Sequence, residues 1–409
     1  MKRSLHNLRQ AGFSLIELMV SMAIGLLVLS ALIALMLNVS RNNTEMTKTN
    51  QVIENGRLAL QLLQTDLSHA GYWGGFVPDF EDLSLTTAPT DLPTAVPNPC
   101  QAYTTWDAAY KTNLVGIAMQ AYEIPAVVPS PTLSVCAGVV TNPKANTDVL
   151  VVRHAENCVA GVGNCPAYGN GNLYFQVARN GTTRPSPGYL LTDATTAAAP
   201  TSVPAVPFTL QNRDGTTAEL RKFISNLYYV RNFSTTAGDG IPTLMRSQFQ
   251  LTSTTGLLSH RLPQALVEGV EGFRVEFGVD NTSDAGINVV TGANPLGVVS
   301  PSNLQSAAIN WAVTVPENTS PTNRGDGSPD GAYIRCTTAA PCTAAQLRNV
   351  VAAKIYVLIR SIDVTPGYIN TKRYTLGSTT LEPFNDGFKR HLFSQTIRLV
   401  NVSARRETP

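Results

Sequence analysis

The sequence is poor in charged residues, and the charges that it has nearly cancel. Asp, Glu, Lys and Arg make up 14% of the 409 residues, against roughly 25% in an average soluble protein. There are 30 Lys plus Arg residues and 28 Asp plus Glu residues, so the formal net charge is only +2. Nucleic-acid binding needs a broad basic field. The composition therefore argues against nucleic acid as a main partner.

The sequence also lacks the short motifs of common enzymes. It contains no GxSxG, HExxH, GxxxxGKS/T or GxGxxG string. Histidine is scarce, and no two of the five lie at a metal-ligand spacing; they are His6, His69, His154, His260 and His391. We therefore predict that the protein is not an enzyme.

What the chain does have is typical of a loop-rich β protein outside the cytoplasm. Gly (30) and Pro (26) are frequent, and six cysteines suit an oxidising compartment. Proximity in the sequence pairs Cys158 with Cys165 and Cys336 with Cys342, which leaves Cys100 with Cys136. Six cysteines allow 15 connectivities, so these three disulfides are a prediction from proximity. A zinc site would need closer CxxC pairs.

The amino terminus carries a short basic tag followed by a long apolar run. Residues 1–12 contain Lys2, Arg3 and Arg9 and no acid, and residues 13–37 contain a single charge, Glu17. As a helix this run would be about 37 Å long, enough to cross a hydrocarbon core of about 30 Å. The basic tag should stay in the cytoplasm, which places the rest of the chain beyond the inner membrane. A cleaved secretory signal fits less well, because the small residue Gly12 precedes the apolar run.

Glu17 is the exceptional residue of this segment. A carboxylate in a membrane-spanning helix costs at least ~2.5 kcal/mol and by default marks a function. If the chain is cut between Gly12 and Phe13, the new amine lies one helical turn before Glu17. Its partner would be Glu17 of the same chain or of a neighbouring copy. Alternatively, Glu17 stays close to the headgroups and is stabilised by the helix dipole.

Five strings carry a resemblance to a known family. GFSLIELMVSMAIG with its basic leader resembles the class III signal of type IV pilins and of type II secretion pseudopilins. QVIENGRLALQLLQTDLSHAGYWG, residues 51–74, resembles a segment of the PilW-type minor pilins of type IV pili, and so do NLYYVRN, LVEGVEGFRVEFGVD and VVAAKIYVLIRS. The resemblance is close over residues 1–76 and patchy from Arg221 to Ser403.

The resemblance implies a function and its site residues. A prepilin peptidase would cut after Gly12 and methylate the new amino terminus at Phe13, and Glu17 would support recruitment into the growing filament. The protein would then be a structural subunit that helps prime pilus assembly at or near the tip. Its implied partners are other minor pilins, the major pilin, the inner-membrane assembly platform and a tip adhesin. The closest alternative is a J-type pseudopilin; an anchored adhesin or enzyme that uses the long loops is another.

The fold class that follows is α+β and pilin-like. We predict a leader over residues 1–12, a membrane and filament-core helix over 13–37, an amphipathic helix over 38–70 and a β-rich head over 71–409. The apolar stripe Ile53, Gly56, Leu60, Leu63 and Leu67 has helical spacing and should pack on a sheet. Residues 38–51 are rich in Asn and Thr, which favour helices weakly, so a bend or fraying is expected there.

The head should consist of two small antiparallel sheets packed on the helix. Strands are predicted over residues 148–153, 172–179, 223–231, 273–280 and 354–362 from their β-branched and aromatic content. In the fourth, Phe273, Val275, Phe277 and Val279 should point inward, and Arg274 and Glu276 outward. Residues 266–272 are expected to form a turn or short helix. Residues 84–99, 125–131, 185–207 and 317–329 should be long loops.

One acidic group is a candidate calcium site. Asp280, Asn281 and Asp284 lie in GVDNTSDAG, and Asn323, Asp326 and Asp330 lie in NRGDGSPDG, with oxygen donors among glycines as in calcium loops. PilW-type relatives carry an unbroken GVDxDGDGxxD string, which a long insertion separates here. Turn formation, in which Asp and Asn bond to nearby backbone, is the alternative.

Overall fold

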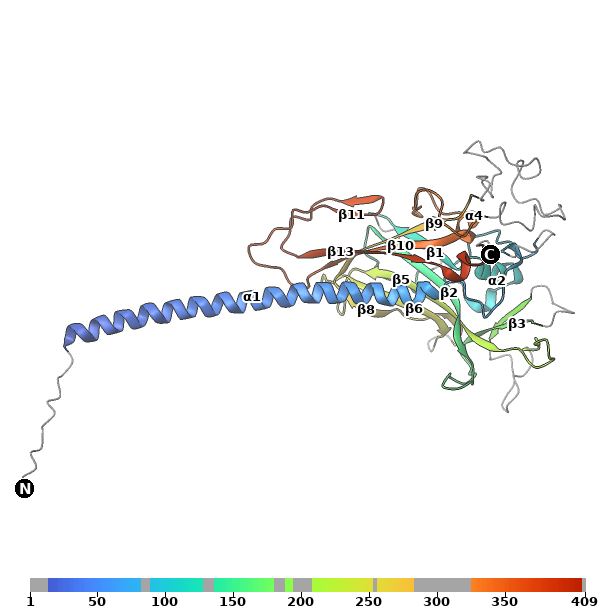
Figure 1. The fold of residues 1–409 in the computed structure, drawn as a ribbon, viewed down its shortest axis with the longest axis horizontal. Coiled ribbons are helices and arrows are strands. Elements are labelled where there is room, and N and C mark those ends of the chain that lie inside the picture. Colours follow the sequence, from blue (N-terminus) through green and yellow to red (C-terminus); the bar gives the residue numbers. More distant parts are fainter. Residues whose placement is uncertain are drawn as a thin grey trace, which may run out of the picture. The chain divides into compact units, whose positions relative to one another are not determined.

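The computed structural model describes residues 14–81, 89–127, 136–179, 188–193, 208–252, 256–282 and 325–406. The chain divides into two compact units, Met1–Gln51 and Val52–Pro409. The described part of the amino-terminal unit is a helix, and the second unit is a β-rich head that includes the last turns of the same helix (Figure 1). This is the α+β class that the sequence predicts.

Helix α1 covers Leu15–His69 without a break. It is long and apolar enough to cross a membrane, with a mean hydropathy of 2.6 in its most apolar window. Residues 38–51 are helical despite their weak helix formers. Three threonines, Thr44, Thr47 and Thr49, donate their hydroxyls to the carbonyls four residues earlier. Their hydrogen-bonding groups are therefore satisfied inside the helix.

Within the head, α1 buries one stripe of side chains. The buried residues are Val52, Gly56, Ala59, Leu63 and Leu67, at spacings of four, three, four and four. Three members of the predicted stripe are confirmed, whereas Ile53 and Leu60 lie at its margin. Helix α1 ends at His69, and Gly71 follows with a φ of +72°, a conformation that favours glycine after a helix.

The other helical segments among the described residues are short. They are η1 (Asp79–Glu81), η2 (Tyr103–Thr105), α2 (Ala108–Gly116), α4 (Ala344–Arg348) and α5 (Val400–Ser403). Asp107 caps α2 by accepting a hydrogen bond from the Tyr110 backbone at 2.7 Å, and Thr343 and Gln346 form a capping box on α4.

The larger sheet of the head has eight strands. They are β1 (Met119–Ile124), β2 (Thr147–Val159), β3 (Leu173–Val177), β4 (Tyr189–Asp193), β5 (Leu220–Arg231), β6 (Thr243–Leu251), β7 (Leu258–His260) and β8 (Gln264–Glu268). The order is β1-β2-β5-β3-β4, and β6 pairs with β5, β7 and β8. One sheet is thus much larger than the two small sheets predicted. Strand β4 lies inside the stretch 185–207 that was predicted as a loop, because its run YLLTD pairs with β3.

A three-stranded sheet and a hairpin complete the described head. The sheet contains β9 (Val270–Val279), β10 (Val350–Arg360) and β13 (Arg390–Arg398) in the order β13-β10-β9, and the hairpin contains β11 (Tyr374–Leu376) and β12 (Thr379–Leu381). The pairings within these sheets are antiparallel. The buried stripe of α1 shares one apolar core with β2, β5, β9, β10 and β13, so the head holds the helix between its two larger sheets.

One local prediction about β9 was wrong. Arg274 and Glu276 are buried, at 3% and 5% exposure, because both faces of β9 are covered. Arg274 reaches Asp148 on β2, and Glu276 accepts a hydrogen bond from Ser378 in the β11–β12 turn. Of the two alternatives predicted for residues 266–272, the structure has a turn: β8 runs directly into β9 through Gly269, which has a φ of +78°.

Candidate functional site

The start of α1 is a capping box formed by Ser14 and Glu17. The backbone N–H of Glu17 donates to Ser14 Oγ at 3.2 Å, and the backbone N–H of Ser14 donates to Glu17 Oε2 at 3.1 Å. Such reciprocal bonds satisfy two donors that a helix leaves unpaired at its first turn. The Glu17 carboxylate is therefore directed toward the chain end at which cleavage is predicted. Gly12 and Phe13 themselves lie outside the described residues.

Exposed apolar side chains surround this carboxylate. Leu15, Ile16 and Leu18 are 75%, 72% and 54% exposed in the isolated chain, as expected for a segment that needs lipid or other helices around it. A carboxylate at a helix amino terminus is stabilised by the helix dipole. Its pairing with a Phe13 amine stays a prediction.

A second polar site joins the last turns of α1 to the large sheet. The Asp66 carboxylate accepts hydrogen bonds from Asn226 Nδ2 at 2.9 and 3.0 Å and from Tyr228 Oη at 3.0 Å, and His154 Nε2 lies 3.0 Å from Asp66 Oδ1. Burial raises the pKa of Tyr228 well above its usual value, and the Asp66 charge adds to this. Tyr228 thus stays a neutral donor to the carboxylate.

The two ring nitrogens of His154 face different oxygen atoms. Its Nδ1 lies 2.9 Å from the Ala155 carbonyl, and its Nε2 faces the Asp66 carboxylate. Both partners are acceptors, so a ring nitrogen that carries a proton can donate to its partner. Asp66 therefore anchors α1 to β2 and β5 through the hydrogen bonds of its carboxylate. Sequence reasoning missed this site, and the signal for it was an acidic residue between Leu63 and Leu67 beside the apolar stripe.

Buried ion pairs join the two larger sheets. Arg335 Nη2 and Arg274 Nη1 lie 2.6 and 3.2 Å from Asp148 Oδ1, and the Val275 backbone N–H donates to Asp148 Oδ2 at 2.9 Å. Arg335 also pairs with Glu123 at 3.1 Å. Burial raises the pKa of Asp148, against the opposing effect of the two arginines. This network fixes β2 against β9.

The described members of the acidic group form hydrogen-bonded turns. Asp280 accepts from the Gly327 backbone at 2.9 Å and from the Asp326 backbone at 3.3 Å, and Arg406 Nη1 lies 3.3 Å from it. Burial raises the pKa of Asp280 to about 6. Asp330 accepts from two backbone amides, those of Asn281 and Thr282.

An arginine and two backbone amides contact the Asp280 carboxylate, whose oxygens would be ligands of such an ion. No group of three or more Cys, His, Asp or Glu that could hold a metal occurs among the residues that the structure describes. The calcium hypothesis stays a prediction, since Asp284 and Asn323 lie outside the described residues.

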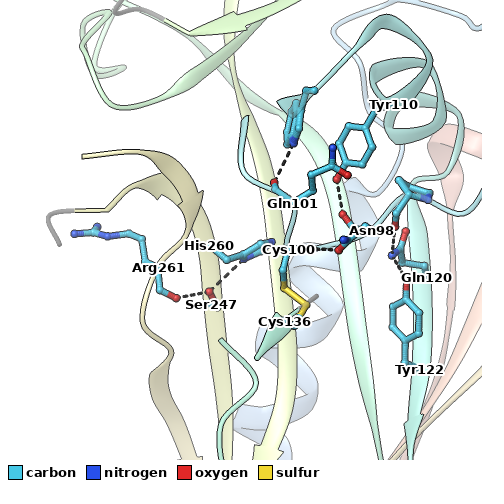
Figure 2. Close-up of a disulfide and its surroundings, with 12 residues drawn as sticks. Asn98, Cys100, Gln101, Tyr110, Gln120, Tyr122, Cys136, Ser247, His260 and Arg261 are labelled. Carbon is cyan, nitrogen blue, oxygen red and sulfur yellow. Dashed lines mark hydrogen bonds between the residues drawn. A yellow bond between two sulfur atoms is a disulfide. The ribbon is translucent and has the colours of Figure 1, made fainter. Parts of the chain in front are cut away.

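Three disulfides link the same cysteine pairs that proximity predicted: Cys100–Cys136, Cys158–Cys165 and Cys336–Cys342. Figure 2 shows the first among hydrogen-bonded loops. The Cys100 backbone N–H donates to Asn98 Oδ1 at 3.1 Å, and Gln120 Nε2 lies 2.6 Å from Tyr122 Oη. Burial lowers the pKa of nearby His260 to about 3, so this histidine is neutral beside Ser247. The surroundings of this bond are a structural element of the head.

Comparisons with known proteins agree with the predicted family. Residues 227–401 match the family model described as Type IV Pilus-assembly protein W, and residues 7–33 match the Prokaryotic N-terminal methylation motif. No curated protein matches the chain. Among solved structures, a type IV-like pilin from Thermus thermophilus is similar at 13% identity, over 64% of this chain and 81% of that one, with a TM-score of 0.26.

The two family matches fall on the parts of the chain that carry the site. The methylation motif covers the Ser14–Glu17 capping box, and the second match covers β6 to β13 and Tyr228 of the Asp66 site. Residues 227–401 thus match the PilW family, and together with the methylation motif this match identifies a minor pilin in type IV pilus assembly.

Proposed function

We propose that this minor pilin is cut between Gly12 and Phe13 by a prepilin peptidase and methylated at the new Phe13 amine. Residues 13–37 then hold it in the inner membrane, with the head in the periplasm, until it enters the pilus and helps prime assembly at or near the tip. The observation that carries this proposal is the capping box at the start of an apolar helix, in which Glu17 faces the predicted cleavage point.

Glu17 can serve assembly because its carboxylate has one partner before cleavage and a second one after it. In the uncut chain the Ser14 backbone N–H occupies one carboxylate oxygen at 3.1 Å. After cleavage an ammonium group lies one residue before Ser14, within one turn of Glu17. In lipid, an ammonium and a carboxylate stabilise one another strongly, because each is costly alone. A neighbouring copy that supplies either charge would be recruited by the same interaction.

A structural role also suits the head. The buried carboxylates Asp66, Asp148 and Asp280 are each bonded to side chains or backbone that hold the fold together. The partners that we propose are other minor pilins, the major pilin, the assembly platform in the inner membrane and a tip adhesin. We infer that the protein acts by binding them and catalyses no reaction.

Substitution of Glu17 tests the proposal. The Glu17→Ala variant, expressed in place of the chromosomal copy, should be processed to the same mature form as wild type apart from the substitution, but surface filaments and motility should be lost. The matched control is Glu54→Ala, an exposed acid on the same helix, which should assemble normally. Normal piliation with Glu17→Ala would contradict the proposal, and so would loss of protein secretion with intact pili.

A further inference from the structure

The loop between β10 and β11 ends in a tight turn that presents apolar side chains. In Thr365-Pro366-Gly367-Tyr368 the Tyr368 backbone N–H donates to the Thr365 carbonyl at 3.1 Å, and Gly367 has a φ of +77°. Proline in the second position and glycine in the third are the signature of a type II turn. Val364 and Ile369 flank the turn and are 52% and 64% exposed.

The turn is held firmly by the segment that precedes β13. The Thr365 N–H donates to the Gly387 carbonyl at 2.8 Å, and the Asn370 N–H donates to the Asp386 carbonyl at 2.7 Å. Asn370 is fully buried and donates its amide to Tyr374 Oη and to the Phe388 carbonyl. The apolar side chains therefore project from an ordered base, which lowers the entropy cost of docking them on a surface.

This turn lies at the end of the head where the chain arrives from its apolar segment. The Arg360 N–H, at the end of β10, donates to the Gly269 carbonyl at 2.8 Å, and Asn55 on α1 donates to the adjacent Glu268 carbonyl at 3.1 Å. The loop thus leaves β10 at the level of the first turn of α1 within the head. Residues 38–51 of the same chain connect this point to the apolar run.

We propose that the Thr365–Tyr368 turn docks on the surface of the bilayer that holds the apolar half of α1, with Val364 and Ile369 entering the interface. This inference rests on the membrane anchoring in the proposed function. The bilayer is the apolar surface to which this end of the head is tethered. Exposed Lys372, close behind Ile369 in the chain, suits the phosphates of lipid headgroups. Docking would orient the head before the subunit is extracted into a filament.

A tryptophan placed in the turn tests the proposal. Full-length Ile369→Trp would be reconstituted in liposomes with or without lipids brominated near the headgroup. The control is Leu262→Trp, at a residue that is 75% exposed and precedes β8, the strand whose far end contacts Asn55. Because an interfacial side chain lies ~5–10 Å deep, the brominated lipid should quench about half of the emission that the Ile369→Trp substitution adds. It should leave the emission added by Leu262→Trp unchanged.

The outcomes separate this inference from the proposed function. If Ile369→Trp floats with the liposomes but its added emission is not quenched, the docking proposal is overturned while membrane anchoring stands. If the protein does not float with liposomes, the proposal of membrane anchoring is overturned, and the docking proposal, which depends on it, is overturned as well. An emission change that appears only when other pilin subunits are added would make the turn a subunit contact and would also overturn the proposal. Val364→Trp repeats the test if Ile369→Trp does not fold.

Discussion

Gly56 of α1 lies directly against Phe393 of β13, so that a Cβ atom at residue 56 would stand 2.1 Å from the ring carbon Cε2. The helix and the smaller sheet therefore meet at a point where only glycine fits. This contact lies next to Asn55, where α1 also donates to the Glu268 carbonyl. The entry of the helix into the head is thus fixed on two sides.

Gly56→Ala should destabilise the head, although alanine favours helices. Replacement of an exposed helical glycine by alanine gains about 1 kcal/mol, but overpacking at a close contact costs ~1–3 kcal/mol. We expect a net loss in the free energy of unfolding, measured by urea titration of the full-length protein in detergent. In a Phe393→Ala background the same substitution should become stabilising. A loss of equal size in both backgrounds would show that the ring is not the cause.

Asp66→Ala should weaken the attachment of α1 to the sheet. The change leaves three donors, on His154, Asn226 and Tyr228, without their acceptor. Loss of one partner from a largely buried, charge-assisted network costs ~2–4 kcal/mol. The control Glu54→Ala, exposed on the same helix, should change the stability by less than about 0.5 kcal/mol. Equal effects of the two variants in the same urea titration would refute the anchoring role.

The stability of the head should depend on the pH through Asp280. Because burial raises its pKa from 3.8 to about 6, the folded state holds this proton more tightly than the unfolded chain does. The stability that this group contributes is therefore full below about pH 4 and is lost as the pH rises to about 6.

Comparison with Asp280→Asn isolates this effect. Between about pH 4 and 6.5, the unfolding free energy of wild type should fall relative to that of the variant by about 1–2 kcal/mol. Above that pH the difference should be constant. A difference that is flat throughout, or that rises with pH, would show that the folded carboxyl has no raised pKa.

Two of the disulfides, Cys100–Cys136 and Cys336–Cys342, should differ in how much they stabilise the folded head. Loop-closure entropy predicts about 4 kcal/mol for Cys100–Cys136, with a sequence separation of 36, and about 2 kcal/mol for Cys336–Cys342, with a separation of 6. The corresponding double Ser variants, compared by thermal unfolding, should therefore rank in this order. The opposite ranking would mean that local packing, and not the size of the closed loop, determines the stabilisation.

The features that sequence reasoning predicted are those set by residues close together in the chain. The apolar run of residues 13–37 predicts the helix, and Cys158–Cys165 needs only a short loop. The Asp66 site could not be predicted, because its partners lie 88 to 162 residues away. Arg274 was misplaced for the same reason: alternation along β9 predicts an exposed face, and only the fold brings Asp148, 126 residues distant, against it.

Processing at the start of α1 is the central step of the proposed function, and the intact mass of the mature protein tests it directly. Protein purified from the membrane fraction should begin at Phe13, carry one added methyl group on its amino terminus and contain three disulfides. A mass that includes residues 1–12, or one that places the amino terminus beyond Leu37, would contradict the central claim that a minor pilin is anchored and assembled through this helix.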